Sequence, residues 1–231
     1  MIEINNLTVE YTGGIKALDG LSFSVADGES IALIGANGAG KSTLLLAIVG
    51  VVTAAGGTIS ADGITLSKHT LNEIRRRIGL VFQNPDDQLF MPLIRDDVAF
   101  GPRNYGLSEP EVAERVDHVL SELGILHLKD RSSMRLSGGE KRTAAIATVL
   151  AMAPSVIMLD EPTAFLDPKA RRTLAAQLDT LTQTKIIATH DLDFAEKTCS
   201  RAIFIKKGKI IADGKAEVLL RDQALMEKCD I

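Results

Sequence analysis

The sequence predicts an α/β fold with a parallel central sheet, and three observations support this prediction. Residues 35–42 read Gly-Ala-Asn-Gly-Ala-Gly-Lys-Ser, which is the spacing of a glycine-rich loop that binds phosphate groups. The apolar run 30–34 before this loop suits a strand, and the run 43–48 after it suits a helix. Two more short and almost wholly apolar runs, 155–159 and 185–189, are typical of strands in the centre of a parallel sheet.

The first part of the chain is rich in strands. Short alternating runs separated by turn signals predict strands at 3–9, 21–25, 30–34, 57–61 and 77–82. The basic run 75–77 indicates the solvated face of a helix rather than a patch that binds nucleic acid. The apolar run 44–55 is interrupted by Gly50, and we interpret it as the helix after the phosphate loop rather than as a membrane span.

The middle of the chain turns helical and charged, and the last part returns to an α/β alternation. Apolar residues recur at helical spacing over 109–123. The remaining expected elements are helices at 141–153 and 168–181, a hairpin of 201–205 with 209–212, and a helical tail at 216–229. We expect one domain over 1–231, in which 1–84 and 153–231 form the α/β core and 85–152 form a helical insertion.

The composition is that of a globular protein and excludes several classes of function. A net charge of −4 gives no general attraction to nucleic acid. Cys199 and Cys229 lack metal-ligand spacing and are expected to be free thiols in a reducing cytosol, and the four histidines are too scattered to suggest a transition-metal site. The acidic opening 1–6 predicts no signal peptide, and no apolar run reaches the ~20 residues that span a bilayer. A membrane role would therefore come through a partner.

The phosphate loop has a local reason for each residue type. Gly35, Gly38 and Gly40 let the backbone curl and turn its N–H groups inward, and the following helix aims further N–H donors at the same point. Lys41 adds a full charge for the β- and γ-phosphates, and the Ser42 hydroxyl can bind Mg²⁺. The plain alternative is a glycine-rich turn with a chance lysine.

Two acidic residues end the predicted strand 155–159. The carboxyl ends of strands are where an α/β sheet places its chemistry. Asp160 suits Mg²⁺, directly or through water, and Glu161 is placed to polarise an attacking water. The alternative is a strand followed by an ordinary acidic turn.

The segment 136–140, Leu-Ser-Gly-Gly-Glu, precedes a long helical run. Ser137 is a good N-cap, and Glu140 three residues later completes a capping box. A well-capped helix explains these two residues. It does not explain Gly138 and Gly139, which weaken a first turn unless the backbone must approach something closely, so a second anion site is the sharper hypothesis.

Taken in this order, the three motifs resemble those of the ATPase subunit of an ABC transporter, over nearly the whole chain. The resemblance implies a P-loop NTPase fold of the ABC type, with an N-terminal antiparallel β subdomain and a helical insertion. Gln83 resembles the Q-loop glutamine, which contacts Mg²⁺ and the attacking water and senses the membrane partner. The segment 164–167 resembles the D-loop, His190 the switch histidine at the γ-phosphate, and Tyr11 the aromatic residue that stacks on adenine.

The resemblance also implies ligands and partners, namely ATP with Mg²⁺, a head-to-tail homodimer or a pseudo-dimer with a related ATPase subunit, and integral membrane transporter subunits at the cytoplasmic face of the cell membrane. It implies no nucleic acid. The implied catalytic residues are Lys41, Gln83, Glu161 and His190, and the implied Mg²⁺ ligands are Ser42, Gln83 and Asp160. The implied nucleotide-binding residues are Tyr11, Gly35, Asn37, Gly38, Ala39, Gly40, Lys41, Ser42, Thr43, Ser137, Gly138, Gly139, Glu140 and Asp167.

The segments 83–90, 96–102 and 104–107 narrow the resemblance to energy-coupling-factor ATPases, in particular the cobalt and nickel importer type. The chain departs from the family pattern at Glu140, where many members have glutamine, and at Thr143, where an arginine usually stands. The apolar cluster 89–93 suits either the core of the helical insertion or a groove for a helix of the membrane partner. Import of a vitamin or another solute stays open, as does a non-transport ABC ATPase in DNA repair, chromosome organisation or translation, or a nucleotide sensor.

Overall fold

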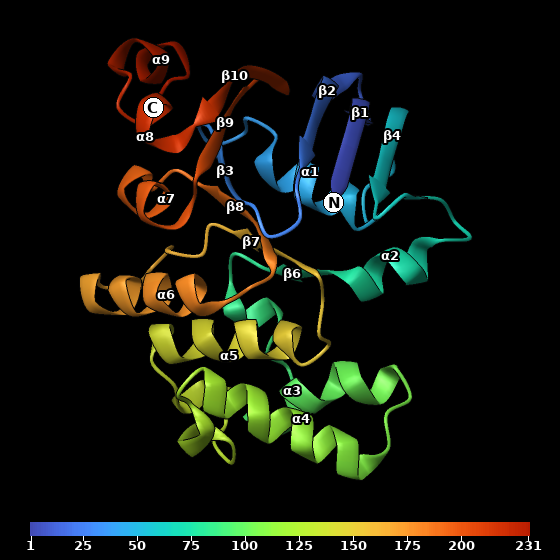
Figure 1. Ribbon diagram of the computed structural model, residues 1–231, viewed down its shortest axis with the longest axis vertical. Helices are drawn as coiled ribbons and strands as arrows, with labels where there is room; N and C mark the ends of the chain where they lie inside the picture. The colour runs from blue at the N-terminus through green and yellow to red at the C-terminus, as the bar shows by residue number, and fades with distance from the viewer. The chain divides into compact units, whose positions relative to one another are not determined.

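The computed structural model describes residues 1–231, which form two compact units (Figure 1). Unit 1 comprises Met1–Leu80, Ser155–Glu161 and Thr182–Ile231, and unit 2 comprises Val81–Pro154 and Pro162–Leu181. No helix has the length and apolar character that crossing a membrane requires.

Unit 1 contains an antiparallel sheet with the strand order β2-β1-β4-β5. Its strands are β1 (Ile2–Tyr11), β2 (Ile15–Val25), β4 (Gly56–Ala61) and β5 (Ile64–Thr65). Every second residue near the start of β1, such as Ile2 and Ile4, is buried, as the period of a half-buried strand requires. β2 is longer than the expected 21–25, because Ile15, Lys16 and Leu18 also pair with the end of β1. The sequence did not predict this extension, because its first residues are exposed and show no apolar alternation.

The second sheet has the strand order β10-β9-β3-β8-β7-β6. Its strands are β3 (Ser30–Ile34), β6 (Ile78–Val81), β7 (Val156–Asp160), β8 (Thr184–Thr189), β9 (Arg201–Lys206) and β10 (Lys209–Lys215). β3 pairs in parallel with both β8 and β9, and β7 pairs in parallel with β8. β8 is buried along its whole length, which explains its continuous apolar sequence. This confirms the predicted α/β fold with a parallel central sheet.

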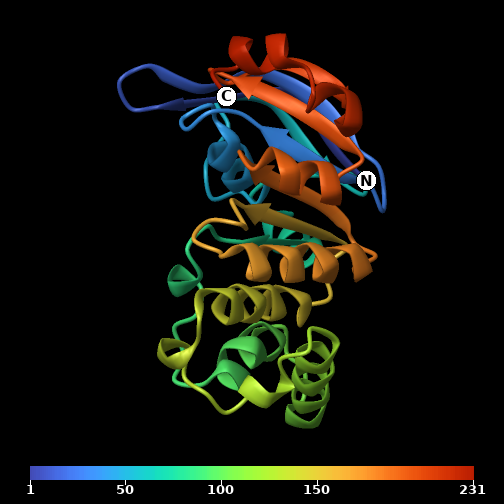
Figure 2. The same cartoon turned by 90° about the vertical axis from the view of Figure 1, so that its left-hand side faces the viewer.

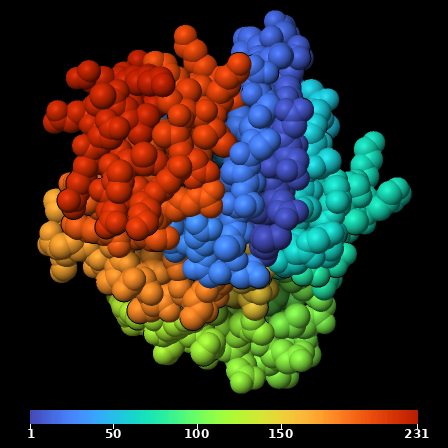
Figure 3. Space-filling view, turned by 45° about the horizontal axis from the view of Figure 1, so that its top comes forward, coloured from blue at the N-terminus to red at the C-terminus, as the bar shows by residue number.

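The helices of unit 1 are short. They are α1 (Lys41–Ile48), α2 (Leu71–Arg77), α7 (Leu192–Thr198), α8 (Ala216–Leu219) and α9 (Gln223–Lys228). The prediction of a helix through residue 55 is wrong, because Gly50 adopts a left-handed φ of 65° and α1 has already ended. The single helical tail is also wrong, because Asp222 caps a new helix by accepting a hydrogen bond from the Leu225 N–H. Figure 3 shows this C-terminal segment, in red, on the same face of unit 1 as the blue N-terminal strands.

Unit 2 is helical. Its α-helices are α3 (Ile94–Asn104), α4 (Glu109–Glu122), α5 (Gly138–Leu150) and α6 (Pro168–Thr180), and its 3₁₀ helices are η1 (Pro85–Asp87), η2 (Leu126–Leu128) and η3 (Ser133–Arg135). α5 contacts α3, α4 and α6, and Figure 2 shows α6 running beside it. Residues 162–181 were expected to belong to the α/β core. They group with unit 2, because α6 packs along α5.

Candidate active site

The phosphate loop lies between β3 and α1 in unit 1. A Cβ on Gly35 would stand 2.4 Å from the Ile205 carbonyl oxygen, so no side chain fits there. Gly40 has a φ of 112°, and a Cβ on it would stand 2.7 Å from the Ala17 carbonyl oxygen. Both glycines are therefore required by the close approach of neighbouring backbone as well as by the curl of the loop.

Lys41, the first residue of α1, is only 6% exposed. Its Nζ donates a hydrogen bond to the Gly35 carbonyl oxygen at 2.6 Å and lies 3.3 Å from Glu161 Oε1. A buried ammonium needs such partners, because burial of an unpaired charge is costly. The lysine is thus held inside the curl of the loop, at the N-terminus of α1, where anions are favoured.

Glu161 follows β7 directly and is also 6% exposed. Its N–H donates to the Ala188 carbonyl oxygen at 2.8 Å, and its backbone has a left-handed φ of 42°, which is uncommon for a non-glycine residue. Its Oε2 lies 2.8 Å from Nδ1 of His190, whose side chain is 63% exposed. The structure therefore brings together Lys41, Glu161 and His190, although the sequence separates them widely.

The other predicted residues of unit 1 border this charged centre. Ser42 is exposed in the first turn of α1, and Asp160 is the half-buried last residue of β7. Thr43 Oγ1 lies 3.2 Å from the Tyr11 hydroxyl, which places the end of β1 beside the phosphate loop. Among the loop's remaining predicted residues, Asn37 and Gly38 are exposed and Ala39 is buried.

A divalent cation could use oxygen atoms of this region. Hydroxyl and carboxylate oxygens, such as those of Ser42 and Asp160, are the ligands that Mg²⁺ prefers. No group of three or more His, Cys, Asp or Glu side chains is placed to hold a metal ion in the structure. The donor set therefore fits an Mg²⁺ ion that takes most of its ligands from phosphates and water, as is usual for nucleotide-bound Mg²⁺.

The capping box of α5 is present in unit 2. The Ser137 N–H donates to Glu140 Oε2 at 2.8 Å, and the Glu140 N–H donates to Ser137 Oγ at 3.4 Å. Hydrogen bonds from the Ser137 hydroxyl and N–H lower the pKa of Glu140 below its usual value. A Cβ on Gly139 would stand 2.9 Å from the Ala170 Cβ, so packing against α6 explains this glycine. A Cβ on Gly138 would stand no closer than 3.8 Å to its nearest neighbour, the Phe165 carbonyl oxygen, so packing does not explain this glycine.

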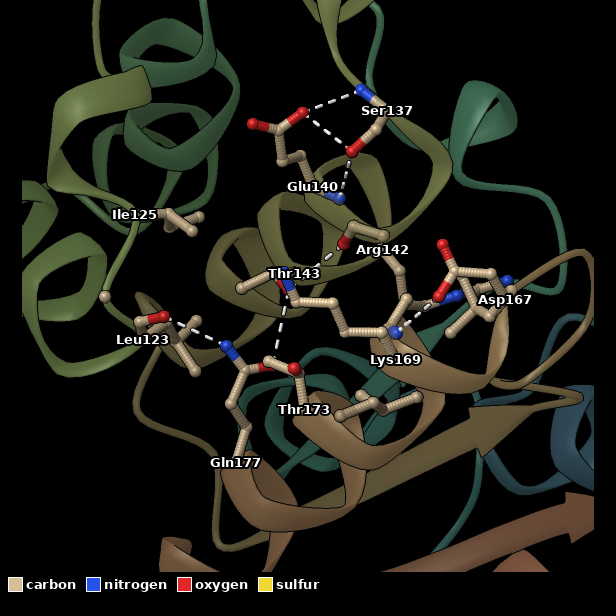
Figure 4. A pocket seen from close by; sticks show the side chains of 15 residues that line it. Leu123, Ile125, Ser137, Glu140, Arg142, Thr143, Asp167, Lys169, Thr173 and Gln177 are labelled. Carbon is tan, nitrogen blue, oxygen red and sulfur yellow. Dashed lines mark hydrogen bonds between the residues drawn. The ribbon is translucent and has the colours of Figure 1, made fainter.

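A cleft of about 420 Å³ opens in unit 2 beside the start of α5 (Figure 4). Its lining includes four of the predicted nucleotide-binding residues: Ser137, Gly139, Glu140 and Asp167. Asp167 is the N-cap of α6 and accepts a hydrogen bond from the Ala170 N–H at 2.8 Å. Thr143 donates to the Gly139 carbonyl oxygen at 3.1 Å and also lies 3.3 Å from Gln177 Oε1. Segments 137–140 and 164–167 therefore contribute to one surface of unit 2.

The Gln83 loop, residues 82–90, follows β6. Gln83 is exposed, and its carbonyl oxygen accepts a hydrogen bond from Arg142 on α5 at 2.6 Å. Sequence reasoning missed Arg142 as well as Gln88, which also reaches from this loop to α5. Arg142 follows a capping box in a helix, and nothing in the local pattern shows which carbonyls a buried guanidinium will find.

The apolar cluster 89–93 divides between core and surface. Leu89 is 4% exposed and belongs to the core of unit 2. Phe90 is 62% exposed, and its ring meets that of Phe100 edge-on at 5.1 Å between centroids. Asp97 fixes this turn, because its Oδ1 accepts hydrogen bonds from the N–H groups of Phe90 and Met91, both at 2.9 Å. Unit 2 therefore presents an aromatic pair on its surface.

Known proteins with similar sequences are ATP-binding proteins of transporters. The family model described as ABC transporter matches residues 18–164. A protein of Geobacter sulfurreducens, provisionally named an ABC transporter ATP-binding protein, is 46% identical over 229 residues, which cover 99% of this chain and 92% of the relative. The energy-coupling factor transporter ATP-binding protein EcfA of Carboxydothermus hydrogenoformans is 43% identical over 227 residues, which cover 97% of this chain and 84% of the relative.

Two solved structures confirm the predicted fold. The structure of CbiO1 from Clostridium perfringens, part of the ABC transporter complex CbiONQ, matches with a TM-score of 0.87 and 38% identity, covering 98% of this chain and 93% of that chain. The ATP-binding cassette MJ0796, a dimer bound to ADP and Pi, matches with a TM-score of 0.83 and 29% identity, covering 94% of this chain and 99% of that chain.

Proposed function

The chain belongs to the ABC transporter family of ATPases, and we propose that it powers an importer of the energy-coupling-factor type. The observation that carries the ATPase role in this proposal is the buried Glu161 carboxylate, which lies between the Lys41 ammonium and the exposed His190 ring beside a phosphate loop. The EcfA relatives and the likeness to CbiO1 support the energy-coupling-factor class. We propose cobalt or nickel as the cargo on the same basis, with a vitamin or another solute as the alternative.

The chain's own residues account for nucleotide binding and for activation of the attacking water. The N–H groups of residues 35–42 and the Lys41 ammonium hold the β- and γ-phosphates, and Tyr11 lies under the adenine. As phosphate arrives, it takes the place of the Glu161 carboxylate as the counter-ion of Lys41. Glu161 is then free to polarise a water for in-line attack on the γ-phosphorus, while His190 orients the transferred group.

Mg²⁺ would neutralise charge on the β- and γ-phosphate oxygens. We propose Ser42 and Asp160 as its ligands, with Gln83 of unit 2 as a further contact to the ion and to the attacking water. Hydroxyl, carboxylate and amide oxygens all suit this hard cation.

We propose that the ATP-bound chain dimerises head to tail, with itself or with a related ATPase subunit, as a single ATPase domain over 1–231. The segment 137–139 of one subunit then closes on the ATP held by Lys41 of the other, and Asp167 lies beside it. A dimer is described for MJ0796. Loss of the γ-phosphate removes the ligand that both subunits bind, so hydrolysis opens the dimer.

The Phe90–Phe100 pair is the surface that we propose for the membrane subunits, at the cytoplasmic face of the membrane. Exposed aromatic side chains are enriched where proteins bind one another. The buried Leu89 is a poor test residue, because a charge there would disrupt the core of unit 2. Phe90→Glu with Phe100→Glu tests the surface, and Val218→Glu, at a 60% exposed position of unit 1, is the matched control.

The experiment is affinity purification of the tagged full chain from detergent-solubilised membranes, followed by identification of the associated proteins. The proposal predicts a multi-span scaffold and a small membrane subunit, both lost with the double Phe variant and retained with Val218→Glu. A metal-binding small subunit supports cobalt or nickel, and a vitamin-binding one changes only the cargo. Recovery with DNA or ribosomal partners alone would overturn the transport role and leave the ATPase chemistry.

A further inference from the structure

Two buried or half-buried side chains connect the Gln83 loop to α5, and both bind the backbone of Phe82. Arg142 is 1% exposed, and its terminal nitrogens donate to the carbonyl oxygens of Phe82 at 2.7 Å and Gln83 at 2.6 Å. The fork of a guanidinium suits two neighbouring carbonyls in a way that a single ammonium cannot. Strand β6 has ended by Phe82, so these carbonyls lie where sheet partners are lost.

Gln88 completes the attachment from the loop side. Its Oε1 accepts a hydrogen bond from the Phe82 N–H at 3.0 Å. Its Nε2 donates to the Ala145 carbonyl oxygen and to Thr148 Oγ1 on α5, both at 2.8 Å. The Phe82 residue is therefore held at its N–H and at its carbonyl, in each case by a side chain that is bound to or part of α5.

A third contact between the same elements differs in kind. Lys141 on α5 pairs with Asp86 at 2.6 Å, but the Asp86 side chain is 57% exposed. An exposed ion pair adds little to stability, because water screens it and two long side chains lose freedom. This pair joins the same helix and loop without touching Phe82 or Gln83, so it provides a matched control.

We propose that Arg142 and Gln88 are positioning residues that fix the backbone of Phe82 and Gln83 to α5. The Gln83 residue then moves as one body with residues 138–140, which begin α5. The consequence for catalysis rests on the proposed function, because it requires that Gln83 contacts the water or Mg²⁺. The attachment itself does not depend on that role.

The first measurement is amide hydrogen exchange of segment 82–90 in the nucleotide-free full chain. Five N–H groups here, those of Phe82, Asp86, Asp87, Gln88 and Leu89, are hydrogen-bonded within the loop. Exchange should become about tenfold faster in both Arg142→Met and Gln88→Met, since each removes the hydrogen bonds that keep the loop closed. Lys141→Met should leave it unchanged. If Arg142→Met does not fold, the exchange rate of Gln88→Met alone tests the attachment.

The second measurement is steady-state ATP hydrolysis. Loss of a residue that orients a catalytic group costs about 10-fold in kcat, and KM for ATP should stay within about twofold. Arg142→Lys, which can reach one carbonyl, should fall between the wild type and Arg142→Met. In a Gln83→Ala background, Arg142→Met should cost little more, because the residue acts through Gln83.

The outcomes separate the two hypotheses. Unchanged exchange in both Arg142→Met and Gln88→Met would overturn the attachment, whatever the kinetics. The positioning role would be overturned if exchange became faster but Arg142→Met lowered kcat by the same factor in the Gln83→Ala background as in the wild type. Wild-type hydrolysis by Gln83→Ala itself would overturn the role of Gln83 in the proposed function, and the exchange result alone would then decide the attachment.

Discussion

The candidate functional residues of unit 1 and of unit 2 are held in place in different ways. In unit 1, Lys41, Glu161 and His190 are charged or polar side chains that meet directly at strand ends and at the start of α1, and the first two are buried. In unit 2, Ser137 and Asp167 are exposed N-cap residues that turn helix ends toward solvent. The comparison indicates that the candidate residues of unit 1 are side chains already in contact with one another, whereas those of unit 2 are helix N-caps exposed to solvent.

The largest expected effect on ATP binding and on stability follows from breaking the buried Lys41–Glu161 pair of unit 1. Lys41→Met should weaken ATP binding about 100-fold, because a charged partner of the phosphates is lost. It should also lower the free energy of unfolding by about 3 kcal/mol, because Glu161 is left as a buried carboxylate without its ammonium. Nucleotide titration and denaturant unfolding measure the two effects.

Glu161→Gln in the Lys41→Met background controls for this explanation. The neutral amide should restore most of the lost stability without restoring ATP binding, because the uncompensated charge is gone while the phosphate contact is still missing. Stability losses that simply add in the double variant would show that the pair is not coupled.

The second prediction compares two capping boxes of the same type in unit 2. Ser137 pairs with Glu140 at the start of α5, and Ser108 pairs with Glu111 at the start of α4. Ser137→Ala and Ser108→Ala should both lower the free energy of unfolding, the former by about 1 kcal/mol. Only Ser137→Ala should also slow ATP hydrolysis. If the two variants hydrolysed ATP at the same rate, Ser137 would serve only as a helix cap.

The smallest effect concerns the turn that carries Phe90. Burial raises the pKa of Asp97 above its ordinary value of 3.8, against the opposing hydrogen bonds from the Met91 and Phe90 N–H groups. A carboxyl whose folded pKa is raised stabilises the fold at low pH, and that contribution is lost as pH rises through the folded value. Asp97→Asn should therefore gain stability relative to the wild type as pH increases above 3.8, in thermal unfolding. A constant difference across pH would contradict the cause given for the shift.

The two units also differ in how far the sequence could predict them. Residues after strands of a parallel sheet must meet at one edge, so Asp160, Glu161 and His190 could be placed from the runs before them. The capping box of Ser137 and Glu140 was equally visible. The partners of Arg142 and Gln88 could not be predicted, because hydrogen bonds from long side chains to backbone depend on how α5 packs beside the loop. Gly139 was assigned to ligand approach, whereas its contact with Ala170 also requires a glycine.

The central claim is that Glu161 polarises the attacking water, and ATP hydrolysis by Glu161→Gln tests it most directly. The variant should bind ATP, hydrolyse it about 10³-fold more slowly than the wild type, and accumulate as an ATP-bound dimer in light scattering. Hydrolysis at the wild-type rate, with binding intact, would contradict the role of Glu161.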